Sequence, residues 1–239
     1  MIIKVISDLH ISLKSKTNDF LVDDYNFITY LHKICGEANL VVINGDLFEL
    51  LQTFLWKRDA VYFRQIVKQK QNLINVLNYY ILMGKIVYIS GNHDEMVLLK
   101  NLMPCTERHI VEHHGVRVLF EHGHKYDKAY NKYRFTAWLG GYFERFINKD
   151  IDLILLELGK KLNININDDD MYKYAKMLKG MYNADMVVLG HSHNPMIKVD
   201  GKFWYVNTGR GCDRKNQLDE TTINILPNEF GAITKTITI

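Results

Sequence analysis

The sequence is poor in cysteine, and its three cysteines are far apart (Cys35, Cys105 and Cys212). An odd number of distant cysteines argues against a disulfide framework and indicates a reducing compartment. No two of them form a Cys-x-x-Cys pair. The spacing therefore also argues against a zinc site built from thiolates.

Proline is equally scarce, with three in 239 residues, which leaves little room for disordered linkers. The chain has no apolar stretch long enough to direct export or to span a membrane, and residues 1–4 lead straight into a strand pattern. We therefore expect a cytoplasmic protein. The net charge of +3 is too small to indicate a nucleic-acid partner by itself.

The hydrophobic fraction of 47% and the charged fraction of 24% are close to the averages for soluble globular proteins. A chain of 239 residues suits one large domain with an insertion. We expect a single domain over residues 1–239, with a helical insertion at residues 124–184.

Five apolar, β-branched runs in this chain are each followed by side chains that can bind metal. The runs are residues 2–6, 40–43, 85–89, 116–120 and 186–189. The clusters that follow them are Asp8-Leu9-His10, Gly45-Asp46, Gly91-Asn92-His93-Asp94, Glu121-His122-Gly123-His124 and Gly190-His191-Ser192-His193. Because layered α/β folds bind ligands outside the strand ends, we expect these clusters to form one site. Carboxylate, imidazole and amide ligands favour hard to borderline divalent ions.

The remaining pattern predicts alternating strands and helices followed by a strand-rich final third. Helices are expected over residues 20–36 and 55–83, the second ending at Gly84. Hairpins are expected at residues 111–120 and 196–206, the latter with a type I′ turn at Asp200-Gly201. Two further strands are expected at residues 221–226 and 232–239. This order predicts two packed sheets flanked by helices.

The order of the five clusters resembles the calcineurin-like metallophosphoesterases, whose signature reads D-x-H, G-D, G-N-H-[DE], H and G-H-x-H. All five parts occur here in order, from residue 8 to residue 193. The resemblance implies an α/β fold, the four-layer α/β/β/α sandwich, and a two-metal site that hydrolyses phosphate esters or pyrophosphates. It implies Mn²⁺ as the favoured ion, with Fe²⁺, Zn²⁺ and Ni²⁺ as alternatives.

The resemblance also implies a role for each cluster residue. Asp46 would bridge two ions, with a hydroxide held between them as the nucleophile. The other ligands implied are Asp8, His10 and His193 for the first ion, and Asn92, His122 and His191 for the second. His93 would act as a cation or acid at the phosphate, oriented by Glu49, while Asp94 supports the same catalytic loop.

Gly45 to Glu49 reads Gly-Asp-Leu-Phe-Glu, which looks like the branch containing UDP-2,3-diacylglucosamine pyrophosphatase. The order His122-Gly123, helical insertion, Gly-His-x-His and Pro195 also matches that branch. The branch usually has Arg where this chain has His93, and Asp where it has His124. Because His93 restores the general phosphatase and nuclease motif, a nuclease or a cyclic-nucleotide phosphodiesterase is the alternative.

The predicted insertion lies over the site edge and suggests a lid or substrate cap. Residues 124–149 carry six Lys or Arg against two acids, and an apolar stripe at helical spacing (Phe135, Trp138, Leu139, Tyr142, Phe143 and Phe146). Such a segment suits an anionic amphipathic substrate or peripheral contact with a membrane surface. The alternative is that the stripe packs on the sheet and the lysines form a solvated face.

The expected partner is a phosphorylated small molecule or a lipid nucleotide. His124 and Arg210 are candidate substrate-binding residues, Arg210 by a bidentate contact with phosphate. A nucleic-acid partner is not favoured, and no obligate protein partner is evident. A catalytically inactive scaffold is the third reading, although such members tend to lose the site histidines that this chain retains.

Overall fold

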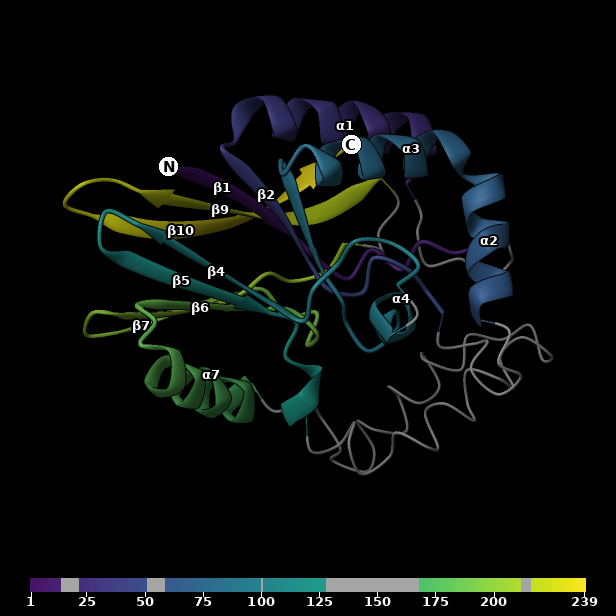
Figure 1. Ribbon diagram of the computed structural model, residues 1–239. Coiled ribbons are helices and arrows are strands. Elements are labelled where there is room, and N and C mark those ends of the chain that lie inside the picture. The colour runs from purple at the N-terminus through teal and green to yellow at the C-terminus, as the bar shows by residue number, and fades with distance from the viewer. Residues whose placement is uncertain (14–21, 51–58, 100, 128–167, 212–215) are drawn as a thin grey trace.

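The structure, a computed structural model, describes residues 1–13, 22–50, 59–99, 101–127, 168–211 and 216–239. Two mixed sheets lie between outer layers of helices (Figure 1). The first sheet has the order β10 (Phe230–Thr238), β9 (Gln217–Ile225), β1 (Ile2–Ile6), β2 (Leu40–Asn44) and β3 (Ile86–Ile89). The second has the order β4 (Arg108–His113), β5 (Val116–Glu121), β6 (Met186–Leu189), β8 (Phe203–Asn207) and β7 (Met196–Asp200).

Each sheet combines parallel and antiparallel strands: the first is antiparallel at one edge, where β9 and β10 lie, and the second at both edges. Strands β1, β2 and β3 are parallel, with Ile3 opposite Leu40 and Val41 opposite Ile86. In the second sheet β5, β6 and β8 are parallel, while β4 and β7 pair antiparallel with their neighbours. Because parallel strands end at the same edge, the residues that follow them gather there.

The strand side chains alternate between two apolar layers. In β1, Ile3 and Val5 face the second sheet, where Phe120 and Val188 pack against them, whereas Ile6 faces the helices. This period of two is the pattern of a sheet that is buried on both faces. A core between the sheets and separate cores under the helices confirm the predicted four-layer arrangement.

Helix α1 (Asp24–Glu37) covers the first sheet through a stripe that includes Phe27, Leu31 and Ile34. It begins where the Asp23 carboxylate accepts hydrogen bonds from the backbone N–H groups of Tyr25 and Asn26, at 3.0 and 3.3 Å. This N-cap explains why the helix starts later than predicted. Residues 14–21 lie outside the described residues.

The single helix predicted over residues 55–83 is wrong, because the chain forms α2 (Asp59–Gln69) and α3 (Gln71–Leu82). Lys70 leaves the helical conformation, with φ −112° and ψ 34°, and its buried ammonium group lies 2.6 Å from Asp24. The apolar spacing continues across the break because both helices face the same core, so periodicity does not reveal it. Residues 51–58 lie outside the described part.

The hairpin of β7 and β8 forms as predicted, but its turn is shifted by one residue. Asp200 pairs with Phe203, so the two loop residues are Gly201 and Lys202. Only Gly201 has a positive φ, +60°, whereas a type I′ turn requires positive φ at both positions. Asp200-Gly201 is therefore not a type I′ turn.

Helix α7 (Asp168–Tyr182) covers the outer face of the second sheet through Met171, Tyr174 and Leu178. It is the last part of the predicted insertion. Most of the basic and aromatic stretch of that insertion, residues 128–149 with the apolar stripe, lies outside the described residues, whereas Lys125 is described and pairs with Glu107 at 3.0 Å. No helix among the described residues is long and apolar enough to cross a membrane.

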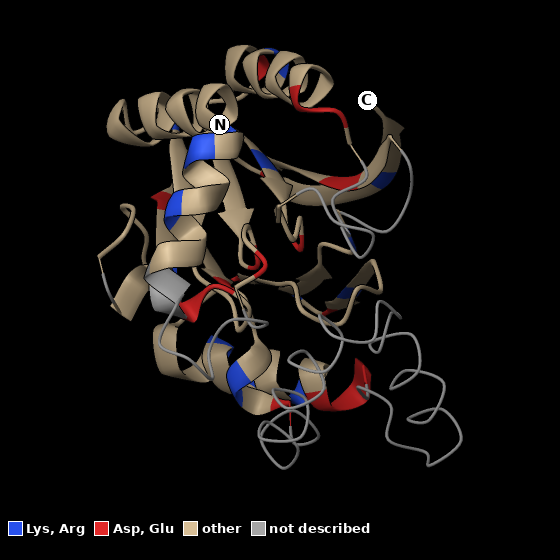
Figure 2. Ribbon diagram, turned by 90° about the vertical axis from the view of Figure 1, so that its right-hand side faces the viewer, with Lys and Arg blue, Asp and Glu red and all other residues tan. Residues whose placement is uncertain are grey.

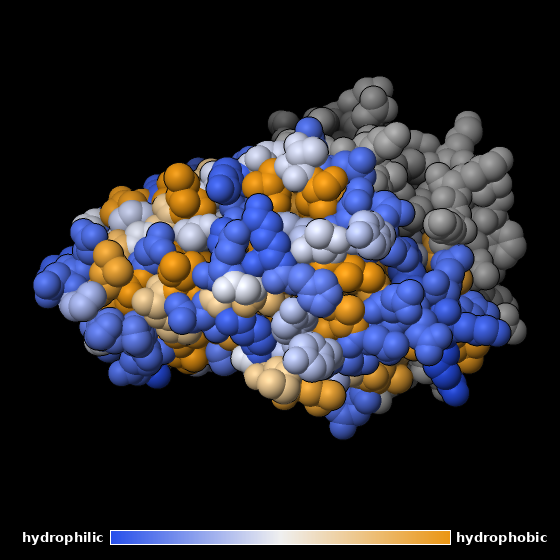
Figure 3. Space-filling model, turned by 90° about the horizontal axis from the view of Figure 1, so that it is seen from above, coloured by the Kyte–Doolittle hydropathy of each residue, from blue (hydrophilic) through white to orange (hydrophobic). Residues whose placement is uncertain are grey.

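The described surface carries mixed residue types. Lys and Arg are spread over several helices and strands (Figure 2). On the face seen from above α1 and α3, hydrophobic residues occur in small groups between hydrophilic ones (Figure 3). Tyr79, Leu82 and Met83 at the end of α3 are among the exposed apolar residues. Single exposed apolar side chains of this kind are common on protein surfaces.

Candidate metal centre

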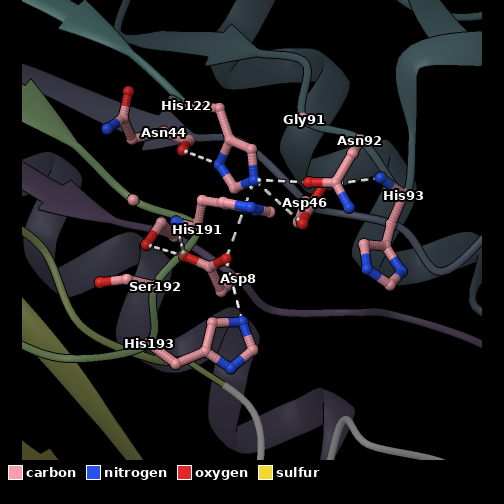
Figure 4. Close-up of polar contacts among 12 residues, drawn as sticks. Asp8, Asn44, Asp46, Gly91, Asn92, His93, His122, His191, Ser192 and His193 are labelled. Atoms are coloured by element: carbon pink, nitrogen blue, oxygen red, sulfur yellow. Dashed lines mark hydrogen bonds and ion pairs between the residues drawn. The ribbon is translucent and has the colours of Figure 1, made fainter. Parts of the chain in front are cut away.

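Five strands bring the predicted ligands to one edge, where the two sheets meet (Figure 4). The strands and the ligands that follow them are β1 with Asp8 and His10, β2 with Asp46, β3 with Asn92, β5 with His122, and β6 with His191 and His193. Backbone hydrogen bonds continue past the strand ends, from Asp8 N–H to Gly45 O and from His10 N–H to Asp46 O, both 3.0 Å. The loops are therefore held to one another.

Backbone strain is concentrated in these loops. Positive φ angles occur at Asp8 (55°), His10 (48°), Asp46 (52°), His191 (70°) and His193 (54°). Residues other than glycine rarely adopt this left-handed region, which costs about 1–2 kcal/mol per residue. Strain of this kind gathers at functional sites, where the surrounding structure holds it.

A first group of possible ligands consists of Asp8, His10 and His193, whose ligand atoms lie within 4.8 Å of one another. Asp8 Oδ1 is 3.2 Å from His193 Nε2. Within the described residues, His10 Nε2 is buried and makes no hydrogen bond, while the buried Asp8 Oδ1 has only imidazole nitrogens near it, those of His193 and, at 4.0 Å, His122. Buried polar atoms are normally satisfied, so an unpartnered imidazole nitrogen beside a buried carboxylate fits a cation.

A second group consists of Asp46, His122 and His191, also within 4.8 Å. His122 Nδ1 donates to the carbonyl oxygen of Asn44 at 2.9 Å, which turns Nε2 toward the acids. Nε2 lies 3.0 Å from Asp46 Oδ2 and 3.2 Å from Asn92 Oδ1. A histidine whose outer nitrogen is tied to a carbonyl in this way is typical of metal ligands.

The electrostatics of the cluster reflect its buried charges. Burial raises the pKa of Asp8, but His193 and His122 outweigh it and lower the pKa to about 2. Burial lowers the pKa of His122, but Asp46 outweighs it and raises the pKa to about 9. Buried carboxylates therefore remain charged and depend on nearby positive charge. The donor set, its burial and its unpartnered imidazole nitrogen all fit divalent ions at these two groups.

His93 and Glu49 form the contact that the sequence predicted. His93 Nδ1 lies 2.5 Å from Glu49 Oε2, and the same oxygen lies 3.2 Å from His10 Nδ1. Burial raises the pKa of Glu49, but His93 and the two hydrogen bonds lower it to about 2. Glu49 is thus an anionic anchor for two imidazoles, and His10, Glu49 and His93 form a third group of possible ligands within 4.8 Å of one another.

Asp94 ties two loops together beneath the site. Its carboxylate accepts hydrogen bonds from Gly91 N–H (2.6 Å), Phe48 N–H (3.1 Å) and the Tyr88 hydroxyl (2.5 Å). Burial and then Asp46 raise the pKa of Asp94 to about 6 against these bonds. These contacts agree with the predicted support of the loop.

The two predicted substrate-binding residues lie beside the cluster. His124 is buried in η2 (His124–Tyr126), with its ring centroid 5.5 Å from that of His122. Burial, followed by the charge of His122, lowers its pKa to about 2. Arg210 donates from Nε to the carbonyl oxygen of His193 at 3.1 Å, which places it next to the last ligand loop. Their contact with substrate stays a prediction.

Asp127 lies at the site, although no motif in the sequence identifies it. It is buried, and its Oδ2 lies 3.1 Å from His191 Nε2. The signal in the sequence is weak, since the acid stands between Lys125 and Lys128 in a lysine-rich stretch. Only the folded chain brings it to His191.

Comparisons with known proteins agree with this geometry. A family model described as "Calcineurin-like phosphoesterase" matches residues 1–195. No curated protein matches the sequence. Similar solved structures include wild-type Vps29 complexed with Zn²⁺ from Entamoeba histolytica, at 13% identity and TM-score 0.50 over 100% of this chain and 99% of that one. The phosphoesterase YfcE from E. coli is 16% identical, with TM-score 0.45 over 100% of both chains. At 13% identity the likeness to Vps29 shows the fold alone.

Proposed function

Because the chain belongs to the calcineurin-like phosphoesterase family, we propose that it hydrolyses phosphate ester or pyrophosphate bonds with two divalent metal ions. The observation that carries the proposal is the pair of ligand groups at one sheet edge, Asp8-His10-His193 and Asp46-His122-His191. Each group combines carboxylate and imidazole donors, and each lies at the ends of strands that hold it rigidly.

As the family resemblance implies, Asp46 would bridge the two ions and Asn92 would complete the second group. Asp46 Oδ2 lies 3.0 Å from His122 Nε2, and Asp46 Oδ1 accepts a hydrogen bond from His93 N–H at 2.9 Å. Mn²⁺ is the ion that the family resemblance favours, and the mixed carboxylate and imidazole donors also accept Fe²⁺, Zn²⁺ or Ni²⁺. When bound, the two ions supply Lewis-acid charge and an acidified water for attack on phosphorus.

His93 is the proposed acid or electrostatic group at the phosphate. Glu49 holds its Nδ1, so Nε2 is the ring nitrogen directed away from that anchor. An anionic partner at Nδ1 favours the imidazolium, which can stabilise negative charge or protonate a leaving oxygen. The His93 side chain is 17% exposed, so a substrate can reach it, whereas Glu49 beneath it is buried.

The finer proposal is a lipid-nucleotide pyrophosphatase acting on a UDP-diacylglucosamine-type substrate. It rests on residues 45–49 and on the order of the later motifs, with His124 and Arg210 as substrate contacts. Contact with a membrane surface through the insertion belongs to the same proposal. The alternative, a nuclease or nucleotide phosphodiesterase, is favoured by His93. In the view of Figure 2, the described Lys and Arg are spread over separate helices and strands, whereas a nucleic-acid backbone would call for a basic stripe.

Hydrolysis with Mn²⁺ tests the proposal directly. We would compare bis-p-nitrophenyl phosphate with UDP-2,3-diacylglucosamine, using the wild-type chain and Asp46→Asn. The variant keeps the side-chain shape but removes the charge of the bridging ligand, so it should lose metal from both groups and lose activity. Asp200→Asn is the matched control, because Asp200 pairs with Lys176 on the surface at the other end of β7.

Each substrate result has a separate meaning. Selective cleavage of the lipid nucleotide supports the pyrophosphatase reading. Cleavage of the generic diester alone supports a two-metal phosphodiesterase and rejects the lipid nucleotide. A chain that binds two ions and cleaves neither substrate nor nucleotide phosphodiesters would instead be a scaffold of this fold, and the proposal of catalysis would be wrong.

A further inference from the structure

Asp127 contacts a proposed ligand of the second ion. His191 follows β6, has φ 70°, and belongs to the group with Asp46 and His122. Its Nε2 lies 3.1 Å from Asp127 Oδ2, and both side chains are buried, with exposed fractions of 8% for His191 and 7% for Asp127. A buried carboxylate at one ring nitrogen fixes both the tautomer and the orientation of an imidazole.

The same arrangement recurs at two other proposed ligands. His10 Nδ1 faces Glu49 Oε2 at 3.2 Å, and His122 Nδ1 donates to the carbonyl oxygen of Asn44 at 2.9 Å. In each case an oxygen that is not a proposed ligand holds one ring nitrogen. Asp127 therefore holds His191 in the way that Glu49 holds His10.

Asp127 is itself held by the helix layer. Its backbone N–H donates to the carbonyl oxygen of His124 at 3.2 Å, which closes η2. The ring of the preceding Tyr126 stacks on Tyr174 of α7, with centroids 3.4 Å apart. The Tyr174 hydroxyl donates to Glu121 at 2.7 Å, directly before His122. The carboxylate is thus placed by packing between β5 and α7.

We propose that Asp127 is a positioning residue for the second metal ion: it orients His191, and the stack of Tyr126 on Tyr174 places Asp127. This inference rests on the proposed two-metal function. Helix α7 contributes no ligand to either group. Through the stack on Tyr174 it would nevertheless affect how tightly the second ion is bound. A residue in this position strengthens the second site and leaves the first site unchanged, since its carboxylate contacts His191, which lies outside the group of Asp8, His10 and His193.

The test is Mn²⁺ binding by the full chain, without substrate. Asp127→Ala should lower the affinity for the second ion about 10- to 100-fold and leave the affinity for the first ion unchanged. Asp127→Asn keeps an acceptor oxygen and should lose less than the alanine variant. Calorimetry gives both affinities, and electron paramagnetic resonance distinguishes a spin-coupled Mn²⁺ pair from a single ion. If Asp127 had only a structural role, Asp127→Ala would lower the affinity for both ions or for neither.

Asp168→Asn is the matched control. Asp168 lies at the start of α7 and accepts a hydrogen bond from Asn194 at 2.6 Å, so it is an acid at the same edge whose partner is not a proposed ligand. It should bind both ions like the wild type.

The outcomes separate this inference from the proposed function. If the wild-type chain binds fewer than two ions, both the proposed function and this inference are wrong. Two ions in the wild type, with unchanged second-ion affinity in Asp127→Ala, would overturn the inference alone. If the alanine variant does not fold, Asp127→Asn decides, and equal second-ion affinity in that variant overturns the inference.

Discussion

At the residue scale, close approach between loops is made possible by glycine. A Cβ added to Gly91 would lie 2.1 Å from Asp46 Oδ1 and 2.7 Å from its backbone nitrogen. A Cβ added to Gly45 would lie 2.1 Å from His122 Nδ1. Because these neighbours are themselves held by hydrogen bonds, the loops cannot move apart without displacing a proposed ligand.

Gly91→Ala should therefore disturb the metal centre. We expect at least about a 10-fold loss of Mn²⁺ affinity, the size of effect seen when support of a ligand is lost, measured by calorimetry. Gly36→Ala in α1 is the control, because nothing lies within 4 Å of its added Cβ. Wild-type Mn²⁺ affinity in Gly91→Ala would contradict the steric argument.

His93→Ala tests the proposed acid. Loss of a general acid typically lowers turnover by about 100-fold or more, while both ions should stay bound because His93 is not a proposed ligand. Turnover of bis-p-nitrophenyl phosphate and metal content per chain are the two measurements. His32→Ala, in which the changed histidine contacts Tyr80 on the outer helix layer, is the control. Metal loss from His93→Ala would refute its role as a non-ligand.

At the element scale, the helices stabilise the sheets and stand apart from the chemistry. Helix α1 packs on the first sheet through Phe27, Leu31 and Ile34, and none of the proposed ligands belongs to it. Its start depends on the Asp23 cap, which satisfies two backbone N–H groups. Changes here should affect folding without affecting metal binding.

Asp23→Ala should lower the free energy of unfolding by about 1 kcal/mol, the usual cost of losing an N-cap. Chemical denaturation measures that change, and Mn²⁺ affinity should remain that of the wild type. Lys33→Ala, an exposed change on the same helix, should stay within about 0.5 kcal/mol of the wild type. Equal unfolding free energies for the Asp23 variant and the wild type would show that the cap is not needed.

At the scale of the whole molecule, the site joins the two sheets. Asp8, Asp46 and Asn92 follow strands of the first sheet, while His122 and His191 follow strands of the second. An ion bound by ligands from both sheets acts as a cross-link that exists only in the folded chain. Its binding free energy therefore adds to the stability of the whole fold.

Mn²⁺ at 100 times its dissociation constant should raise the free energy of unfolding by about 2.7 kcal/mol for each independent site. Thermal unfolding with added Mn²⁺ and with chelator measures the difference. Asp46→Asn should show a much smaller difference, since it lacks the bridging charge. If added Mn²⁺ does not change the melting temperature of the wild type, this result would argue against an ion bound by ligands from both sheets.

The sequence by itself determined which residues follow strand ends and the order in which they occur. Strand alternation and short motifs are local, so they suffice to assign Asp8, Asp46 and His122 to one edge. The contact between His93 and Glu49 was also predictable, because the resemblance supplied the pairing. The predicted cap stays a prediction for residues 128–167, which lie outside the described part of the chain.

Only the tertiary structure decided which distant groups support the ligands. His191 and Asp127 are 64 residues apart, and Asn44 and His122 are 78 apart. The break at Lys70 likewise depends on its contact with Asp24, 46 residues away. Spacing along a chain limits only neighbours within an element, whereas these contacts depend on how sheets and helices pack, which no local pattern records.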